Sequence, residues 1–496
     1  MDAVTTERRE AAPAETGPSR AHDLTVGPIN RTLLLFALPT LGSNVLQSLN
    51  GSINAIWVGR FLGESALAAT SNANLVMFLM FSLGFGFAMA ATILIGQRMG
   101  ARDVEGARRA FGTGVGMFAV LSLLIALVGW VAAPGLLRLL ATPPAAHAMA
   151  LAYLRVIFLA LPPIFLGLLV SMALRGTGDS ITPLRFMMLS VVLDAGLNPL
   201  LIRGWGLVPA MGIAGSAMAT LIANYVVLAG MIAYLYARDL PIRLRGPELR
   251  FLVPERALLR TIATKGLPIG MQMLVMSLSG LVMIGLVNRQ GVAVTAAYGV
   301  AQQLWTYVQM PAMAIGAAVS AMAAQNIGAG RWDRVGLITR SGVLGNLAMT
   351  GALVAILLLF DRPVMGLFVG TASPAIPIAR HIQFIASWSF ILFGATMVLF
   401  ATVRANGAVL APLLILTLGS LVVRVTFAWT MMPRFGPDML WWSSPVSSSV
   451  TLALALLYYR YGSWRQGMLV PPVSHEEART HSNADAEPAG RLNPAG

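Results

Sequence analysis

Apolar runs long enough to cross a lipid bilayer recur from Arg31 to Tyr461, and this feature limits the possible folds more than any other. A membrane-spanning helix needs about 20 apolar residues. The chain has 496 residues, of which 57% are hydrophobic and only 11% are charged, whereas soluble domains carry about 25% charged residues. The alternating pattern of membrane β-strands is missing from the sequence. We therefore expect an all-α polytopic membrane protein.

The number of spans follows from the length of the apolar region. About 430 residues lie between the two polar tails, and one helix with its share of loop takes about 35 residues, so about twelve transmembrane helices fit. The expected spans are 31–56, 66–96, 110–132, 148–172, 184–202, 212–237, 261–287, 295–324, 341–360, 379–402, 408–432 and 440–461.

The distribution of lysine and arginine predicts the orientation in the membrane. With the N-terminus placed in the cytoplasm, 25 of the 34 Lys and Arg residues fall on the cytoplasmic side and 7 on the other side. The positive-inside rule then predicts an inner-membrane, multi-pass protein with both termini cytoplasmic. Residues 1–30 and 462–496 are polar and are expected to be disordered cytoplasmic tails.

The two halves of the chain resemble each other at a nearly constant offset. Four motifs recur in order: Leu-Pro at 38 and 267, Val-x-Arg at 58 and 287, Gln-x-x-Gly-Ala at 97 and 325, and Arg-x-x-Gly-x-x-x-x-Pro at 175 and 404, each 228 or 229 residues apart. Six spans per half give both halves the same topology, which is a parallel repeat. We expect an N-lobe over 31–237, a C-lobe over 261–461 and a cytoplasmic inter-lobe loop over 238–260. Such bundles usually hold a substrate cavity between the lobes and work by alternating access.

Several kinds of chemistry are disfavoured by the composition. The chain has no cysteine, which excludes disulfides and thiolate chemistry. Its only lysine, Lys265, is followed by Gly266, so no nucleotide-binding Gly-Lys-Ser/Thr loop exists and transport would use an ion gradient or a separate subunit. No catalytic set is evident. We expect a non-enzyme without cofactor or metal that does not bind nucleic acid.

Asp194 is the one acidic residue that falls clearly inside an expected span. A carboxylate at the centre of a membrane helix costs about 2.5 to 3.5 kcal/mol unless it is protonated, paired or solvated. Asn198 lies one helical turn later, on the same face. Asp194 and Asn198 could carry H⁺ or hold Na⁺ together with Ser216 and Thr220, or Asp194 could merely bond a helix that is broken near Pro199.

Polar residues also form stripes at helical spacing. The first span carries Ser43, Gln47, Asn50 and Asn54, and the seventh, at the repeat offset, carries Gln272, Met276, Ser279 and Met283. Further stripes are Gln302, Thr306 and Gln309 in the eighth span and Ser216, Thr220 and Asn224 in the sixth. We interpret Gln47, Asn50, Asn54, Gln272, Met276, Gln302 and Thr306 as lining a substrate pathway. The alternative is hydrogen bonding between helices, which is common in membrane bundles.

Four more residues within spans have open roles. Pro39 and Pro268 occupy equivalent repeat positions and are candidate hinges or static kinks. Arg155 could extend to the membrane surface. Arg424 is equivalent to Ala195, beside Asp194. It could pair with a charge across the lobes, pair within its own lobe or line a cavity.

The sequence resembles the MATE (multidrug and toxic compound extrusion) transporters over nearly all of residues 31–461. The motifs that carry the resemblance are Trp57-Val-Gly-Arg60-Phe-Leu-Gly63 with Ala66-Leu-Ala-Ala69, Gln97-x-x-Gly100-Ala101, Leu193-Asp-x-x-Leu-Asn-Pro199, Met211-Gly-Ile-Ala-Gly-Ser216, Ala297-Tyr-Gly299 and Ala324-Gln-Asn-Ile-Gly-Ala329.

The resemblance implies a twelve-helix, two-lobe antiporter that exports amphipathic, often cationic compounds in exchange for H⁺ or Na⁺. The sequence departs from the family pattern in four ways, one of which is that the family's C-lobe acid in the tenth span has no evident counterpart. The first-span acid of many members is Asn54 here, the family's seventh-span Glu corresponds to Met276, and the fifth-span order of Asn and Asp is inverted to Asp194 and Asn198. Coupling through Asp194 is therefore expected.

We predict a secondary antiporter that exports amphipathic molecules or drugs, works as a monomer and has small substrates and membrane lipids as its partners. One alternative is a flippase for lipid-linked precursors, which would need a strongly cationic cavity. The other is a membrane scaffold that transports nothing.

Overall fold

The structure is a computed structural model that describes residues 23–139, 142, 144–204, 209–369 and 375–466, and helices are its only regular elements in these ranges. In chain order the helices are α1 (Ile29–Leu62), α2 (Glu64–Gly100), α3 (Val104–Leu139), α4 (Pro144–Gly176), α5 (Ile181–Arg203), α6 (Ile213–Ala237), the 3₁₀ helix η1 (Gly246–Leu252), α7 (Arg256–Asn288), α8 (Val292–Gly328), α9 (Trp332–Leu359), α10 (Asp361–Val369), α11 (Ala375–Ala386), α12 (Ser389–Ala405), α13 (Leu410–Leu416), the π-helix η2 (Thr417–Val423), α14 (Arg424–Phe435), α15 (Asp438–Tyr461) and the 3₁₀ helix η3 (Ser463–Gln466).

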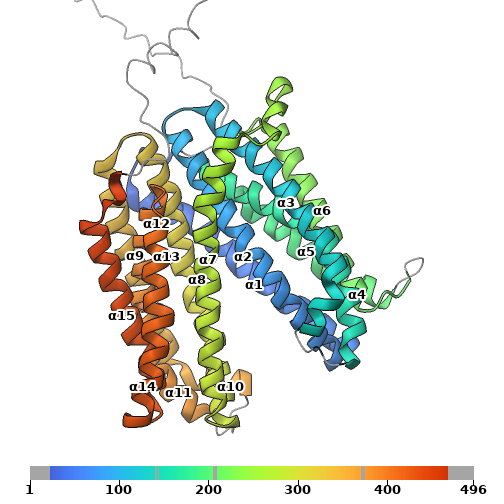
Figure 1. Cartoon of the computed structure of the whole chain (residues 1–496), viewed down its shortest axis with the longest axis vertical. Helices are drawn as coiled ribbons and strands as arrows, with labels where there is room; N and C mark the ends of the chain where they lie inside the picture. Colours follow the sequence, from blue (N-terminus) through green and yellow to red (C-terminus); the bar gives the residue numbers. More distant parts are fainter. Residues whose placement is uncertain (1–22, 140–141, 143, 205–208, 370–374, 467–496) are drawn as a thin grey trace, which may run out of the picture.

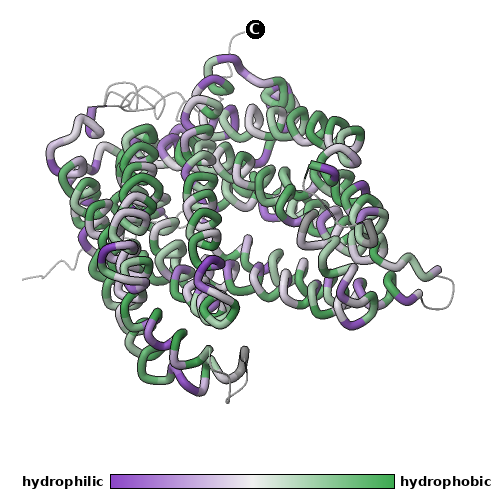
Figure 2. The backbone as a smooth tube through the Cα atoms, turned by 60° about the horizontal axis from the view of Figure 1, so that its bottom comes forward, coloured by the Kyte–Doolittle hydropathy of each residue, from purple (hydrophilic) through white to green (hydrophobic). Residues whose placement is uncertain are grey.

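The predicted all-α membrane fold is confirmed. Eleven helical segments of the described chain are long and apolar enough to cross a bilayer, and the bent pair α11–α12 makes twelve. Hydrophobic residues predominate along the helices (Figure 2). On α3 the side chains of Leu123, Leu127 and Val131 are 59%, 65% and 73% exposed, as expected of a surface that faces lipid.

Each predicted span is found, but three details differ. Helices run past the predicted ends, most clearly α9, which begins at Trp332 rather than at 341, because amphipathic turns continue a helix beyond the bilayer. The predicted span 379–402 is two helices, α11 and α12, with a 43° bend between them. The short helix α10 was not predicted.

The helices form two bundles of the same design. In α1–α6, α4 packs against α2, α3 and α6, and α5 packs against α1 and α6. In α7–α15, the repeat-related helix α12 packs against α8, α9 and α15 in the same way. Figure 1 shows both bundles close together at the end that carries the chain termini and diverging toward the opposite end. We call these ends the termini side and the far side.

Two repeat-related glutamines join the lobes at the termini side. Nε2 of Gln97 in α2 donates a hydrogen bond of 2.7 Å to the carbonyl of Ala405, and Nε2 of Gln325 in α8 donates one of 2.9 Å to the carbonyl of Gly176. Each bond crosses from one lobe to the other. We call this pair of hydrogen bonds the glutamine cross-link.

Glycines one turn after these glutamines allow the close approach. A Cβ atom on Gly100 would lie 1.9 Å from the carbonyl oxygen of Gln325, and one on Gly328 would lie 1.9 Å from that of Gln97. No side chain fits at either position unless the lobes separate. The Gln-x-x-Gly motif that the repeat analysis found is therefore the contact between the lobes.

Helix α1 changes partner at its proline. Before Pro39, Leu33 and Phe36 cluster with Ile315 of α8 in the C-lobe. After it, Gly42 meets Leu184 of α5 in the N-lobe. Pro39 thus lies where α1 passes from one lobe to the other.

Helix α7 makes the equivalent change. Gly266 and Gly270 approach the backbone of α2 in the N-lobe at Gly86. Beyond Pro268, Ser279 donates a hydrogen bond to the carbonyl of Ser420 in the C-lobe. The two candidate hinges therefore lie at equivalent crossing points, and both helices run on without a break.

The predicted tails extend too far into the chain at their inner ends. The backbone N–H of Leu24 bonds Oε1 of Gln325 at 3.1 Å, and Asn326 donates to the carbonyl of Leu24 at 3.0 Å. At the other end Trp464 is 2% exposed, and its carbonyl accepts a bond of 2.6 Å from Asn406. Apolar side chains, Leu24 and Trp464, hold these segments against the bundle. The rest of both tails, 1–22 and 467–496, lies outside the described residues.

The predicted inter-lobe loop 238–260 contains structure of its own. Its 3₁₀ helix η1 lies on α3, where Glu248 pairs with Arg108 at 2.7 Å and Phe251 meets Gly112. Helix α7 begins inside the predicted loop, at Arg256.

Candidate ion and substrate sites

Asp194 lies in the middle of α5 and is 3% exposed. Oδ1 of its carboxylate accepts hydrogen bonds from Thr220 Oγ1 at 3.1 Å and from Asn198 Nδ2 at 3.4 Å. Asn50 of α1 also lies within hydrogen-bonding reach. All other acidic residues of the described chain lie in loops or near helix ends. The buried carboxylate is thus solvated by amide and hydroxyl groups from three helices rather than by a counter-charge.

A second set of polar contacts continues this cluster toward α4. Ser216 Oγ of α6 donates a hydrogen bond of 2.6 Å to Asn54 Oδ1 of α1. The hydroxyl of Tyr153, which is 3% exposed, lies within hydrogen-bonding reach of Asn54. The helices α1, α4, α5 and α6 therefore share one polar core, which we call the Asp194 cluster: Asn50, Asn54, Tyr153, Asp194, Asn198, Ser216 and Thr220.

Two amide oxygens of the Asp194 cluster are without a donor. Oδ1 of Asn50 and Oδ1 of Asn198 are both buried and accept no hydrogen bond from the described residues. Carboxylate, hydroxyl and amide oxygens are the ligands that hard cations prefer. The same carboxylate can instead take up a proton. The Asp194 cluster therefore presents oxygen atoms of the kinds that bind a proton or a hard cation.

The C-lobe holds a cavity of about 230 Å³ that is lined by α7, α8, α12, α14, α15 and η2. Three of the predicted pathway residues, Met276, Gln302 and Thr306, line it. Arg424 is its one charged lining residue. No acidic residue of the described chain forms an ion pair with Arg424, so of the three open roles the structure favours cavity lining.

The remaining predicted pathway residues lie elsewhere. Gln47 is on an exposed face of α1. Gln272 is 4% exposed, and its Oε1 accepts a hydrogen bond of 3.2 Å from Arg404. Asn50 and Asn54 belong to the Asp194 cluster rather than to a separate pathway. The polar residues of α1 therefore lie on one face of the helix, but their surroundings differ.

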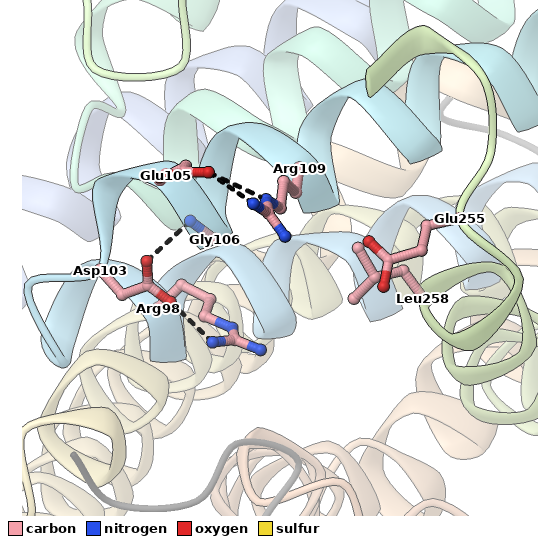
Figure 3. A pocket seen from close by; sticks show the side chains of 7 residues that line it. All are labelled: Arg98, Asp103, Glu105, Gly106, Arg109, Glu255 and Leu258. Carbon is pink, nitrogen blue, oxygen red and sulfur yellow. Dashed lines mark hydrogen bonds and ion pairs between the residues drawn. The ribbon is translucent and has the colours of Figure 1, made fainter. Parts of the chain in front are cut away.

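A polar pocket of about 240 Å³ lies on the termini side, where the α2–α3 turn meets the start of α7 (Figure 3). Four of its five charged side chains form two ion pairs, Arg98 with Asp103 at 2.6 Å and Arg109 with Glu105 at 2.6 Å, whereas Glu255 forms no ion pair with the described residues. This pocket fastens the turn between two helices, and its ion pairs leave it little capacity for a substrate.

Some residues of these sites gave no signal in the sequence. Tyr153 is an isolated tyrosine in an apolar helix, and only its contact with Asn54 reveals its place. In the C-lobe cavity, Trp305 and Phe390 gave no signal, and Tyr298 appeared only as part of the Ala297-Tyr-Gly299 motif. The Gln-x-x-Gly repeat did give a signal, but its spacing could not reveal that the partners are backbone carbonyls of the opposite lobe.

Comparison with known proteins identifies the family and supports the repeat. The MatE family model matches the chain twice, over residues 39–200 and 268–430, so the two matches start 229 residues apart, as the predicted repeat requires. The chain is 36% identical to "Probable multidrug resistance protein YoeA" of Bacillus subtilis (strain 168), with 87% of this chain and 93% of that protein covered. It is 31% identical to "Probable multidrug resistance protein YpnP" of the same organism, with 90% and 98% covered.

A solved structure shows the same fold. It is titled "Outward-facing conformation of a multidrug resistance MATE family transporter of the MOP superfamily" and superposes with a TM-score of 0.82 at 22% identity, covering 90% of this chain and 98% of that one. The family model matches both repeats, two relatives are more than 30% identical, and the two-lobe fold is shared. The chain belongs to the MATE family of multidrug export transporters.

Proposed function

We propose that this protein is a secondary active antiporter that exports amphipathic, often cationic small molecules across the inner membrane in exchange for H⁺ or Na⁺. Both termini are then cytoplasmic, in line with the excess of Lys and Arg on the termini side. The family and the relatives support drug export. The direction and the coupling are our inference.

The observation that carries the proposal is the buried Asp194 carboxylate. It has hydroxyl and amide neighbours but no basic partner among the described residues. A carboxylate in a membrane bundle that lacks a counter-charge is stabilised by binding a proton or a cation. If the ion and a cationic substrate both favour the charged carboxylate, each lowers the affinity for the other, which is the linkage that an antiporter needs.

The packing of the lobes supplies the second element, a reversible gate. The described contacts between the lobes centre on the termini side, and the bundles diverge on the far side (Figure 1). In the proposed orientation the far side faces outward, so this state would release substrate. Opening inward requires that the glutamine cross-link breaks while α1 and α7 bend near Pro39 and Pro268.

The other parts of the proposal need no further component. We propose no cofactor beyond the coupling ion, and no partners besides the substrate and membrane lipids, with the monomer as the functional unit. The flippase alternative has less support, because Arg155 is exposed and lies over the Trp130 ring at 5.7 Å, so Arg424 is the one cationic residue that lines the C-lobe cavity. The scaffold alternative predicts no gradient-driven flux at all.

The test uses purified protein in proteoliposomes that contain a fluorescent cationic dye. A proton gradient and a sodium gradient are imposed separately, and dye flux is compared between the wild type and Asp194→Asn at matched folded amounts. We expect one gradient to drive flux in the wild type and neither to drive it in Asp194→Asn. The gradient that works identifies the coupling ion.

Asp333→Asn is the matched control. It makes the same change at an exposed residue in the first turn of α9 and is expected to transport normally. Full flux in Asp194→Asn would refute coupling at this residue. Absence of flux in the wild type with either gradient would refute antiport of cationic dyes.

A further inference from the structure

The C-lobe cavity has the opposite polarity to the Asp194 cluster. We propose that it is an oxyanion subsite in which Arg424 binds the carboxylate of an aromatic substrate. This inference rests on the proposed function, since it names a substrate class for the same transporter. It adds that the protein handles aromatic acids and zwitterions as well as simple cations.

Arg424 is placed for such a contact. It lies near the middle of the span Leu410–Phe435, where a charged side chain is costly unless it has a partner or water. Its Nε is buried and has no hydrogen-bond partner among the described residues. Tyr298 lies near it and lines the same cavity. A guanidinium presents several donors in a planar fork that matches a carboxylate in bidentate fashion.

A π-helical turn leads directly to Arg424. The segment η2, Thr417–Val423, interrupts the α-helical pattern one residue before it. Short π segments inside membrane or globular helices often mark functional sites. In the N-lobe, the equivalent stretch of α5 is regular α-helix. The π turn therefore distinguishes the span with the arginine from its repeat partner with the aspartate.

Neighbouring hydroxyls stabilise this turn. Ser447 of α15 donates a hydrogen bond of 2.8 Å to the carbonyl of Gly419, and Ser279 of α7 donates one to the carbonyl of Ser420. Gly419 also lies so close to α15 that a Cβ atom would be 1.9 Å from Thr451 Oγ1. Hydroxyl groups commonly satisfy backbone carbonyls that irregular turns leave free in membrane helices. The π turn is thus built into the lobe by two adjacent helices.

The rest of the lining suits the body of an aromatic acid. The hydroxyls of Ser444 and Ser448 line the cavity and form no hydrogen bond with other described residues, so they are available to a carboxylate. Part of the lining is aromatic: ring centroids lie 5.8 Å apart for Tyr298 and Trp305 and 5.3 Å apart for Trp305 and Phe390. The Trp305 N–H is already bonded to Ser387, which leaves its ring as an apolar surface.

The experiment compares two probes with the same ring system, 1-naphthoate and its neutral amide, 1-naphthamide. Equilibrium dialysis against the full-length protein in lipid nanodiscs gives their dissociation constants without any gradient. We expect the wild type to bind naphthoate about tenfold more tightly than naphthamide. Arg424→Gln should bind both equally, and Arg424→Lys should retain part of the preference, because lysine keeps the charge but not the fork.

Arg155→Gln is the matched control, since Arg155 is also an arginine within a span but is exposed and lies on Trp130. It should keep the full preference. Thermal unfolding of each variant shows whether it is folded. Because the dialysis uses no gradient, the result does not depend on ion coupling. Equal affinities of the wild type for both probes, no naphthoate binding, or an unchanged preference in a folded Arg424→Gln variant would overturn the proposal.

Discussion

The two lobes are alike where they meet and different where they enclose polar groups. At the termini side, Gln97 and Gln325 make equivalent hydrogen bonds to the opposite lobe, and Gly100 and Gly328 make equivalent backbone contacts. In the middle of the bundle, α5 carries Asp194, whereas the equivalent span carries Arg424 after a π-helical turn.

This difference indicates which parts of a duplicated transporter remain symmetric. A rocking motion between two lobes needs equivalent surfaces on both sides, because each state must close with similar energy. Ion and substrate recognition have no such need, so one lobe can hold the acid and the other the base. We therefore expect paired substitutions at the interface to have similar effects, and substitutions in the middle of the bundle to have different effects in the two lobes.

The largest effect is expected for Gly100→Leu and Gly328→Leu. Each side chain would enter a space where a Cβ atom alone lies 1.9 Å from a carbonyl oxygen of the other lobe. Overpacking of this kind costs about 1 to 3 kcal/mol. Because the lobes could no longer close on the termini side, gradient-driven flux should be lost equally in both variants.

Gly336→Leu in α9 is the control, since no atom lies within 4 Å of a Cβ atom there. Thermal unfolding and dye flux are measured for all three variants. Normal dye flux in Gly328→Leu together with loss of flux in Gly100→Leu would show that the interface is not symmetric.

A smaller effect is expected for Gln97→Ala and Gln325→Ala. Each leaves a buried carbonyl, that of Ala405 or of Gly176, without its side-chain donor. The cost of such an unsatisfied group is about 1 to 3 kcal/mol, which should shift the population toward the state that is open on the termini side.

The measurement is labelling of a single cysteine by a water-soluble maleimide, which is direct because the chain has no cysteine of its own. Ala324→Cys is the reporter, as Ala324 is fully buried beside Gly96 in the interface. Both glutamine variants should raise the labelling rate, and Gln325→Ala should raise it more, because it also removes the acceptor of the Leu24 N–H. Labelling that stays at the wild-type rate would argue against a gating role of the glutamine cross-link.

The smallest effect is expected for Thr220→Val, and it should be confined to the N-lobe. This change removes the hydrogen bond of 3.1 Å to Asp194 while keeping the shape of the side chain. Loss of one such bond is worth about 1 kcal/mol, so the ion concentration for half-maximal transport should shift by about fivefold.

Ser449→Ala is the control from the other lobe. Ser449 occupies the repeat position of Thr220, is exposed and bonds only the carbonyl of Pro445 in its own helix. It should leave the ion dependence unchanged. Equal shifts in both variants would mean that the lobes share the ion site.

Much of the fold could be predicted because lipid imposes a simple rule on sequence. Span positions, the repeat and the two-lobe design all follow from runs of apolar residues and from motifs at one offset. The helix ends were predicted less well, because polar turns such as Trp332–Arg340 continue α9 beyond the bilayer. The predicted tails include ordered residues, because one buried side chain, Leu24 or Trp464, is enough to order a short polar segment.

The candidate sites show the same limit. The pairing of Asp194 with Asn198 could be predicted from helical spacing, and Thr220 from its polar stripe. The π turn before Arg424 could not, because a single turn with a wider hydrogen-bonding pattern has no distinctive composition. Tyr153 could not be found either, since its role depends on which helix lies opposite. Periodicity identifies the face of a helix but not its neighbour.

In the proposed mechanism, Asp194 exchanges the coupling ion for substrate. The most direct measurement titrates purified protein in weakly buffered detergent solution with a cationic dye, and records the release of protons with a pH electrode and of ²²Na⁺ by dialysis. We predict that dye binding displaces about one cation, H⁺ or Na⁺, per protein in the wild type and in Asp333→Asn, and none in Asp194→Asn. Dye binding that displaces neither ion in the wild type, or that displaces one equally in Asp194→Asn, would contradict it.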